Sequence, residues 1–312
     1  MATPRLSIGL PVYNGAQFLC SALDSILNQD YTDLELIISD NASTDQTPEI
    51  CRRYAAKDRR ISYHRNPENI GASGNYNRVF ELARGEFFKW ASHDDQCHPS
   101  FVRRCLERLL QEPASTVLVH TRADIIDEFG RFQEHSSDAI SSSSSWPHIR
   151  LAKVISSVRF GHALWGVIRA EALRKTRLMG VIEADLVLLA ELALQGELFE
   201  IPDVLYSQRR HPGCAIPTHQ SAKALLAWHD PSRADDRILL PHWERVYVQY
   251  IKGVRHARLR SVDRLLCYGT VPVVSYGRRF LKWTRPFRHR YGLRRKKVSK
   301  GTQAYRQLET SR

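Results

Sequence analysis

The sequence has no apolar run long enough to cross a lipid bilayer. A transmembrane helix needs about 20 consecutive apolar residues, and the longest candidate, residues 265–276, is interrupted by Gly269 and Pro272. The apolar run near the N-terminus, residues 6–12, is short and lacks a basic leader, so we expect no signal peptide. These absences predict a cytoplasmic protein.

The sequence also lacks the paired cysteines of zinc ribbons and thioredoxin-like sites. None of its 6 cysteines forms a C-x-x-C pair. The loose group His93, Cys97, His98 and Cys105 fits no spacing typical of structural zinc. Scattered cysteines in a long chain are typical of small buried side chains in a reducing compartment.

Both common glycine-rich phosphate loops are missing. The G-x-G-x-x-G pattern does not follow the first expected strand, and G-x-x-x-x-G-K-[ST] is absent. Because these glycines let the backbone approach a pyrophosphate closely, their absence disfavours an NAD enzyme and a P-loop NTPase.

Acidic residues are missing from one long segment near the C-terminus. The chain has 312 residues and a formal net charge of +13, and no Asp or Glu lies between Arg278 and Lys300. Aromatic residues alternate there with Lys and Arg, which suits a helix on an anionic membrane surface. A solvated basic tail is the alternative. We find no nucleic-acid-binding motif, so we expect no nucleic-acid partner.

Strands and helices alternate along the first hundred residues. We expect strands at 5–10, 34–39, 60–64 and 86–92, and helices at 16–28, 47–56 and 75–83. Regular alternation is typical of βαβ units. The predicted fold class is therefore α/β, a Rossmann-like, mostly parallel sheet flanked by helices.

The pattern becomes irregular after residue 98 and helical after residue 220. We expect further helices at 99–111, 149–158, 170–176 and 182–194, strands at 115–120, 162–168, 198–201 and 204–208, and a strand pair over 123–133 around the turn 127–130. The serine-rich stretch 136–145 predicts a flexible loop, either a lid or a surface linker. We divide the chain into a domain of residues 1–220 and a helical, basic C-terminal extension of residues 221–312.

Polar side chains follow each of the first strands. They are Tyr13 and Asn14, Asp40 and Asn41, the loop 69–77, and Asp94 and Asp95. Right-handed crossovers bring these strand ends to one edge of the sheet, where α/β proteins bind ligands. Two adjacent carboxylates there suit a hard divalent cation that carries a phosphate, although a solvated Asp-Asp turn would look the same.

Two later groups are further candidates. Glu183 and Asp185 begin an apolar helix, where carboxylates can either perform chemistry or only oppose the helix dipole. Arg210 and His211 follow the last strand, and an Arg fork matches phosphate oxygens. A structural turn with solvated charges is the alternative for the second group.

Several of these segments together resemble glycosyltransferase family 2, which has the GT-A fold. The resemblance covers residues 5 to about 212 and is carried by segments 11–15, 39–45, 69–71 with Asn77, 83–86, and Asp94-Asp95. It implies inverting transfer of a sugar from a UDP-, dTDP- or GDP-sugar to a hydroxyl of a glycan or lipid-linked acceptor, with Mg²⁺ or Mn²⁺ as cofactor. Residues 1–98 would bind the donor and residues 99–220 the acceptor.

The resemblance also implies roles for individual residues. Asp40 would accept a hydrogen bond from a uracil or thymine imide, Asp95 would hold the cation, and Asp185 would be the catalytic base. The full donor-binding set is Pro11, Tyr13, Asn14, Asp40, Gly71, Asn77, Asp94, Arg210 and His211. Glu183 remains an alternative base, because Ala184 separates the usual Glu-Asp pair.

The expected function is assembly of a bacterial surface polysaccharide or glycolipid. The protein would then be either free in the cytoplasm or peripheral on the inner face of the plasma membrane. A non-catalytic protein that binds nucleotide sugars or glycans is the alternative. It is motivated by His93, which stands where the family often has Asp, and by Ala184.

Overall fold

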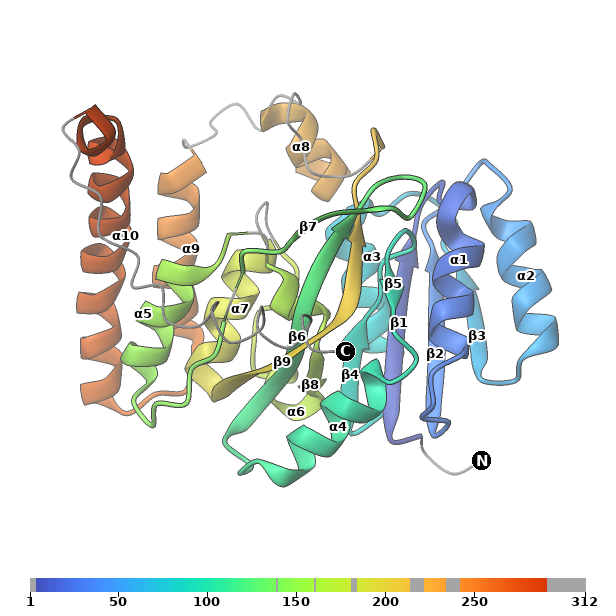
Figure 1. Ribbon diagram of the computed structural model, residues 1–312, viewed down its shortest axis with the longest axis horizontal. Coiled ribbons are helices and arrows are strands. Elements are labelled where there is room, and N and C mark those ends of the chain that lie inside the picture. The colour runs from blue at the N-terminus through green and yellow to red at the C-terminus, as the bar shows by residue number, and fades with distance from the viewer. Residues whose placement is uncertain are drawn as a thin grey trace, which may run out of the picture. The chain divides into compact units, whose positions relative to one another are not determined.

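The computed structural model describes residues 4–138, 140–159, 161–180, 184–213, 222–233 and 242–290 (Figure 1). Contacts divide the chain into two compact units, residues 1–274 and 275–312. Among the described residues, no helix is both long and apolar enough to span a membrane.

One mixed sheet organises the first unit. Its strands are β1 (Leu6–Val12), β2 (Leu34–Asp40), β3 (Ile61–Arg65), β4 (Phe87–Trp90), β5 (Gln96–Cys97), β6 (Thr116–Ile126), β7 (Phe132–His135), β8 (Val167–Arg169) and β9 (Glu197–Arg209). Their order is β3-β2-β1-β4-β8-β6-β9-β5, and β7 pairs with β6.

Most of the long strands point in one direction. β1 is parallel to β2 and β4, β2 to β3, and β6 to β9. β8 is antiparallel to both β4 and β6, so these two strands also share a direction. The carboxyl ends of β1, β2, β3, β4, β6 and β9 therefore lie on one edge of the sheet, which we call the carboxyl edge.

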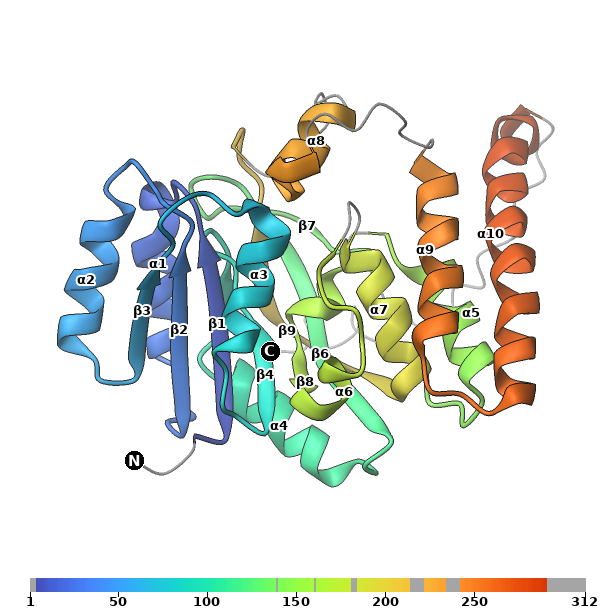
Figure 2. The same ribbon diagram turned by 180° about the vertical axis from the view of Figure 1, so that it is seen from behind.

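Helices cover both faces of the sheet, and further helices follow β9 in the chain. They are α1 (Ala16–Leu27), α2 (Thr47–Lys57), α3 (Gly71–Glu81), α4 (Phe101–Gln111), α5 (Pro147–Ser157), α6 (Ala170–Arg174), α7 (Ala184–Gln195), α8 (Ala222–His229), α9 (His242–His256) and α10 (Ser261–Arg290), with 3-10 turns η1 (His162–Trp165) and η2 (Pro231–Arg233). α1 and α4 lie on the face seen in Figure 1, and α3 lies on the face seen in Figure 2.

Strand β4 shows how the two faces differ. Phe88 and Trp90 belong to the hydrophobic core that includes α3, α5 and α7, whereas Phe87 belongs to the core that includes α1 and α4. This alternation is what a strand buried on both faces requires. Lys89 breaks the apolar pattern, because it is fully buried beside the rings of Phe101 and Tyr206.

The predicted alternation of strands and helices is confirmed, with three local corrections. Residues 162–168 were expected to form one strand, but they begin as η1, which follows Gly161 at φ +75°. Residues 198–208 form part of one long strand, β9, in place of two short ones. The serine-rich stretch is not simply a loose loop, because Ile140 is buried and Ser142 bridges Leu198 of β9.

The C-terminal helices do not all separate from the sheet domain. α8 packs against α3, and α9 packs against α7, so both belong to the first unit. The predicted division into a catalytic domain of residues 1–220 and an extension of residues 221–312 stays a prediction. In the basic segment 278–300, the structure describes no side chains, and residues 291–300 lie outside the described residues.

Candidate active site

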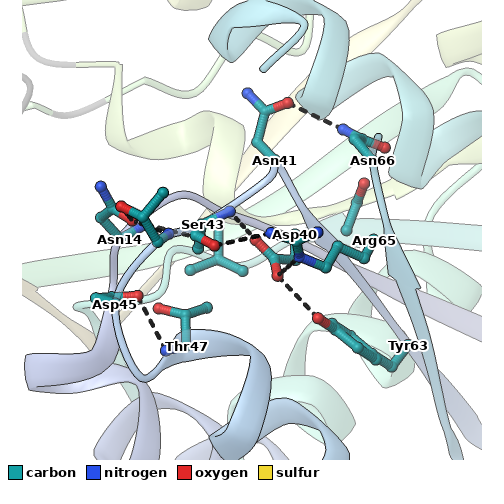
Figure 3. A network of polar contacts seen from close by, with 12 residues as sticks. Asn14, Asp40, Asn41, Ser43, Asp45, Thr47, Tyr63, Arg65 and Asn66 are labelled. Atoms are coloured by element: carbon teal, nitrogen blue, oxygen red, sulfur yellow. Dashed lines mark hydrogen bonds and ion pairs between the residues drawn. The ribbon is translucent and has the colours of Figure 1, made fainter. Parts of the chain in front are cut away.

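The loops after β1 and β2 form one side of the carboxyl edge (Figure 3). Pro11 is buried in β1 in register with Ser39, and Tyr13, two residues on, is 43% exposed. Asn14, at φ 49°, accepts a hydrogen bond from the Thr44 amide through Oδ1 at 2.8 Å. The amide of Asn14 donates to Ser43 Oγ at 2.9 Å. These bonds fix the two loops against each other and leave the Tyr13 ring open to a ligand.

Asp40 anchors the second of these loops. Its side chain is fully buried and accepts hydrogen bonds from the Ser43 amide and the Tyr63 hydroxyl, both at 2.8 Å. Arg65 Nε lies 3.4 Å from the same carboxylate. Burial and then the hydrogen bond to Asp40 raise the pKa of Tyr63. Both carboxylate oxygens are thus bonded within the protein, and base recognition by Asp40 stays a prediction.

A network of amide side chains lies beside Asp40, and the sequence analysis missed it. Asn66 Nδ2 donates to Asn41 Oδ1 at 2.9 Å and to Asn75 Oδ1 at 3.1 Å. Asn75 also accepts a hydrogen bond from Ser39 Oγ at 2.6 Å. Only the clustering of Asn residues after β2 and β3 could have indicated it. The network ties the ends of β2 and β3 to α3.

Residues 69–77 were predicted to form a loop, but α3 begins at Gly71, so Gly71 and Asn77 lie on a helix, where both make internal contacts. Gly71 has φ +78°, and a Cβ there would lie 2.5 Å from the carbonyl oxygen of His229 in α8. Asn77 Nδ2 donates to the Met179 carbonyl at 2.7 Å, and its Oδ1 accepts from the Met179 amide at 2.9 Å. Their predicted contacts with donor remain predictions.

The Asp94-Asp95 pair follows β4, and its two members differ. Asp95 is buried, accepts a hydrogen bond from the Tyr206 hydroxyl, and accepts another from the Arg209 amide at 2.8 Å. Burial and then the charge of Asp94 raise the pKa of Asp95 to about 8. Burial also opposes ionisation of Asp94, but His93, the Ser92 hydroxyl and His211 outweigh it and lower its pKa. Asp94 is therefore the carboxylate that stays ionised.

The end of β9 closes over this pair. His211 Nε2 lies 3.0 Å from Asp94 Oδ2, and Arg209 Nε donates to the Asp94 carbonyl at 2.8 Å. Arg210 forms an ion pair of 2.7 Å with Glu134 on β7. The structure thus places His211 at the pair and Arg210 towards β7. The sequence analysis missed Tyr206 and Arg209, although Arg209 directly precedes two predicted residues.

Asp185 lies in the first turn of α7. Its Oδ1 accepts a hydrogen bond from the Leu186 amide at 2.9 Å. A Cβ on Gly161 would lie 2.9 Å from Asp185 Oδ2, so the left-handed backbone of Gly161 packs directly against the carboxylate. The alternative base, Glu183, lies outside the described residues.

Tyr76 of α3 links Asp185 to the Asp94-Asp95 pair. Burial raises the pKa of its phenol, and the charges of Asp94, Asp95 and Asp185 raise it further. A charge shifts a pKa appreciably only from a neighbouring position. The three carboxylates, which are distant in sequence, therefore all lie within electrostatic range of this phenol. The Trp165 ring lies beside it, with 6.0 Å between ring centroids.

The residues present fit a cation that is held partly by the protein and partly by the phosphates of a bound substrate. Within the described residues, no group of three His, Cys, Asp or Glu side chains could hold a metal alone. Asp94 and His211 face each other at 3.0 Å and could supply two ligands. Mg²⁺ usually takes one or two carboxylates together with phosphate oxygens and water, so this arrangement suits a metal that arrives with a diphosphate.

Comparison with known proteins finds relatives that are named glycosyltransferases. A glucosyltransferase of Campylobacter jejuni, GalNAc(5)-diNAcBac-PP-undecaprenol beta-1,3-glucosyltransferase, is 38% identical over 94 residues, which is 30% of each chain. The chain also covers less than two thirds of the length of other curated relatives. It covers 38% of an uncharacterized glycosyltransferase of Rickettsia typhi and 57% of the putative glycosyltransferase EpsH of Bacillus subtilis.

Two solved structures share the fold. Staphylococcus aureus TarS in complex with UDP-GlcNAc has a TM-score of 0.60 at 15% identity, over 86% of this chain and 71% of TarS. The mannosyltransferase PcManGT of Pyrobaculum calidifontis, in complex with GDP-Man and Mn²⁺, has a TM-score of 0.55 at 16% identity, over 92% of this chain and 76% of that one. The predicted GT-A fold is confirmed.

The sequence itself identifies the family. Residues 7–177, more than half of the chain, match the family described as Glycosyl transferase family 2. This span includes the loops after β1 and β2, the amide network and the Asp94-Asp95 pair. The chain belongs to glycosyl transferase family 2.

Proposed function

We propose that the protein transfers a sugar from a nucleotide diphosphate sugar to an acceptor hydroxyl, with inversion at the anomeric carbon. The observation that supports this proposal is that Asp94 and Asp95, which follow β4, and Asp185, in the first turn of α7, all lie within electrostatic range of the Tyr76 phenol. A diphosphate and a general base are both needed at the reacting carbon, and this is the place where the described residues could supply both.

Asp185 is the proposed general base. A hydroxyl is a weak nucleophile until a positioned carboxylate accepts its proton, which contributes roughly 10²–10⁴ in rate. Asp185 takes that proton while the oxygen bonds to the anomeric carbon, and the bond from that carbon to the diphosphate breaks. The bonding electrons leave with the diphosphate. One displacement from the opposite face inverts the configuration.

Donor binding is assigned to residues 1–98 and the end of β9. Tyr13, with Pro11 and Asn14, would border the base and ribose, because its ring is exposed beside the Asp40 loop. Arg210 and His211 would contact the diphosphate. A Mg²⁺ or Mn²⁺ ion, when bound, would stabilise the negative charge that develops on the leaving group.

We favour Asp94 over Asp95 as the carboxylate that reaches the cation, because its pKa is lowered whereas burial raises the pKa of Asp95. Both carboxylates have partners within the protein, Tyr206 and Arg209 at Asp95, and Ser92 and His211 at Asp94. Asp95 would then hold β9 in place beneath the site. TarS and PcManGT were solved with UDP-GlcNAc and with GDP-Man and Mn²⁺, which supports a nucleotide-sugar donor here.

The acceptor is proposed to be a glycan or lipid-linked saccharide of a bacterial surface polymer or glycolipid. The printed name of the C. jejuni relative includes a PP-undecaprenol substrate, which supports an acceptor at a membrane. Residues 99–220 would bind it. The protein would work in the cytoplasm, either free or held on the inner face of the plasma membrane by segment 278–300.

The Asp185→Asn variant tests the proposed reaction. We expect it to bind nucleotide sugar as the wild type does and to lose about 10²–10⁴ of the transfer rate, because Asn cannot accept the proton. Calorimetry measures binding, and release of nucleotide diphosphate from a panel of nucleotide sugars with divalent cation measures turnover.

Glu171→Gln is the matched control for this test. Glu171 is also a first-turn carboxylate, on α6, and pairs with Lys175 on the surface. We expect this variant to keep full turnover. Full turnover in Asp185→Asn would remove Asp185 from the base role. Donor binding without turnover in the wild type would indicate the non-catalytic alternative.

The basic segment gives a separate test of membrane association. We expect a chain truncated before Arg278 to bind vesicles of phosphatidylglycerol at least tenfold more weakly, because each basic residue near an anionic surface contributes about 1 kcal/mol. Vesicles of phosphatidylcholine are the control, and the reaction with a soluble donor should persist. Equal binding of both chains to anionic vesicles would rule out a membrane role for the segment.

A further inference from the structure

The hairpin formed by β6 and β7 carries two large apolar side chains in solvent. Phe129, in the turn, is 73% exposed, and Phe132, at the start of β7, is 53% exposed. β7 pairs with β6 on one side, and its residues are exposed throughout. Exposed aromatic rings grouped on one element often mark a binding surface. Nothing in the proposed donor site uses these rings.

The hairpin is attached directly to the carboxylate pair. Arg209 donates from Nε to the Asp94 carbonyl at 2.8 Å and from Nη1 to the carbonyls of Asp127 and Glu128 at 3.1 and 3.2 Å. One guanidinium therefore spans from the pair to the turn that bears Phe129. The Arg210–Glu134 ion pair holds the strand that bears Phe132 to the end of β9.

The chain that leaves the hairpin is attached to the proposed base. Asp138 accepts hydrogen bonds from the amides of Arg159 at 3.1 Å and Gly161 at 2.8 Å. Gly161 in turn packs against the Asp185 carboxylate. The hairpin is thus joined through Arg209 to the carboxylate pair and, through the chain that follows it, to the segment that packs on Asp185. Both views place β7 at the carboxyl edge (Figures 1 and 2).

The chemistry around the rings suits a sugar more than an apolar ligand. Arg131 stacks on Phe129 with 4.8 Å from its guanidinium carbon to the ring centroid, and His135 lies 5.0 Å from Phe132 between ring centroids. Gln133 and Glu134 are exposed between them. A pyranose has a face of C–H groups and a rim of hydroxyls, so it needs an aromatic surface interspersed with hydrogen-bonding groups.

We propose that Phe129 and Phe132 form the binding surface for the acceptor glycan, by stacking on sugar units next to the one that reacts. The proposal rests on the proposed transferase function for the identity of its ligand. The rings hold the glycan beside Gly161 and Asp185, so that its terminal hydroxyl meets the base. They are binding residues, and they take no part in the chemical step.

The test uses the full chain and an array of immobilised bacterial surface oligosaccharides. We expect the wild type to bind at least one oligosaccharide and the double variant Phe129→Ala/Phe132→Ala to bind it at least tenfold more weakly. Phe129→Tyr/Phe132→Tyr keeps both rings and should bind as the wild type does. Trp146→Ala removes another exposed aromatic ring, outside the hairpin, and should also leave binding unchanged.

Further measurements separate this proposal from the transferase function. Calorimetry with UDP- and GDP-sugars should give the same affinity in the alanine variant, because the donor side is untouched. If the protein binds a glycan through these rings but transfers no sugar, the proposed binding surface is supported and the proposed transferase function is wrong. Equal array binding by wild type and alanine variant, or no binding by either, would overturn the surface.

The alternative explanation for the exposed rings of Phe129 and Phe132 is self-association of the protein. Sedimentation should show that the wild type and the alanine variant have the same oligomeric state. If the alanine substitutions dissociate an oligomer and leave glycan binding intact, the rings form an interface between copies of the chain, and the proposal is wrong.

Discussion

The loops after β1 and β2 hold their polar side chains against one another, whereas the hairpin of β6 and β7 leaves the rings of Phe129 and Phe132 in solvent among charged groups. Asp40 has both oxygens bonded within the protein. On the other side, Phe129 is largely exposed beside a turn held by Arg209. We call these regions the donor side and the acceptor side.

This difference matches what the two proposed ligands require. UDP-, dTDP- and GDP-sugars all carry a diphosphate on a pentose ring, so a rigid, prearranged donor side loses little entropy on binding. Acceptors differ in their sugars, and exposed rings can accept several of them. Substitutions on the donor side should therefore reduce stability first, and substitutions on the acceptor side should reduce ligand binding first.

Asp40→Ala should give the largest loss of stability. It leaves the Tyr63 hydroxyl and the Ser43 amide unpaired and removes the carboxylate beside Arg65. Breaking a buried charged group's contacts costs about 3–5 kcal/mol, which urea unfolding would measure. Asp203→Ala is the control, because Asp203 is 45% exposed in its pair with Arg104 and an exposed pair contributes about 1 kcal/mol or less. A loss below about 1 kcal/mol for Asp40→Ala would contradict a prearranged donor side.

Asp94→Asn and Asp95→Asn should separate the two members of the pair. If Asp94 faces the cation, its amide variant should weaken the metal-dependent part of donor binding by about 10–100-fold. Asp95→Asn should have the smaller effect on metal dependence, because burial raises the pKa of the Asp95 carboxyl to about 8 and so disfavours its charged form. Calorimetry with donor, with and without Mn²⁺, checks the order. If Asp95→Asn weakened metal-dependent donor binding more than Asp94→Asn, Asp95 would be the residue that binds the cation.

The sequence predicted the ends of the strands better than the contacts that orient the residues there, for a physical reason. Parallel strands with apolar cores and polar ends leave a periodic signal, which located Tyr13, Asp40 and the Asp94-Asp95 pair. The residues that orient them, such as Tyr206 and Asn75, come from other strands and helices. Their partners are set by tertiary packing, which a local pattern does not encode.

Lys89 and Gly161 are two further positions where the local sequence pattern did not predict the structure. A buried strand position predicts an apolar residue, yet the Lys89 ammonium donates to the carbonyls of Trp90 at 3.0 Å and Trp165 at 2.6 Å. The strand predicted over 162–168 failed because Gly161 turns the chain at φ +75° to meet Asp185. Both departures from the local rule occur next to the proposed site, where functional geometry can override propensity.

Gly71→Ala should give the smallest of these effects and tests how tightly the donor side is held. Alanine at φ +78° is strained, at a cost of about 1–2 kcal/mol. Its Cβ would also lie 2.5 Å from the His229 carbonyl oxygen and 2.6 Å from Pro231 Cδ, so α8 and η2 must shift. We expect a loss of about 2 kcal/mol in urea unfolding and faster hydrogen exchange in residues 222–233.

Gly269→Ala is the matched control for this last effect. Gly269 lies in α10, and a Cβ there meets no atom within 4 Å, so alanine should be neutral or stabilise the helix by up to about 1 kcal/mol. If Gly71→Ala behaved like this control, α3 would tolerate a Cβ beside α8. The donor side would then owe its order to the amide network of Asn41, Asn66 and Asn75 and not to the packing of α8.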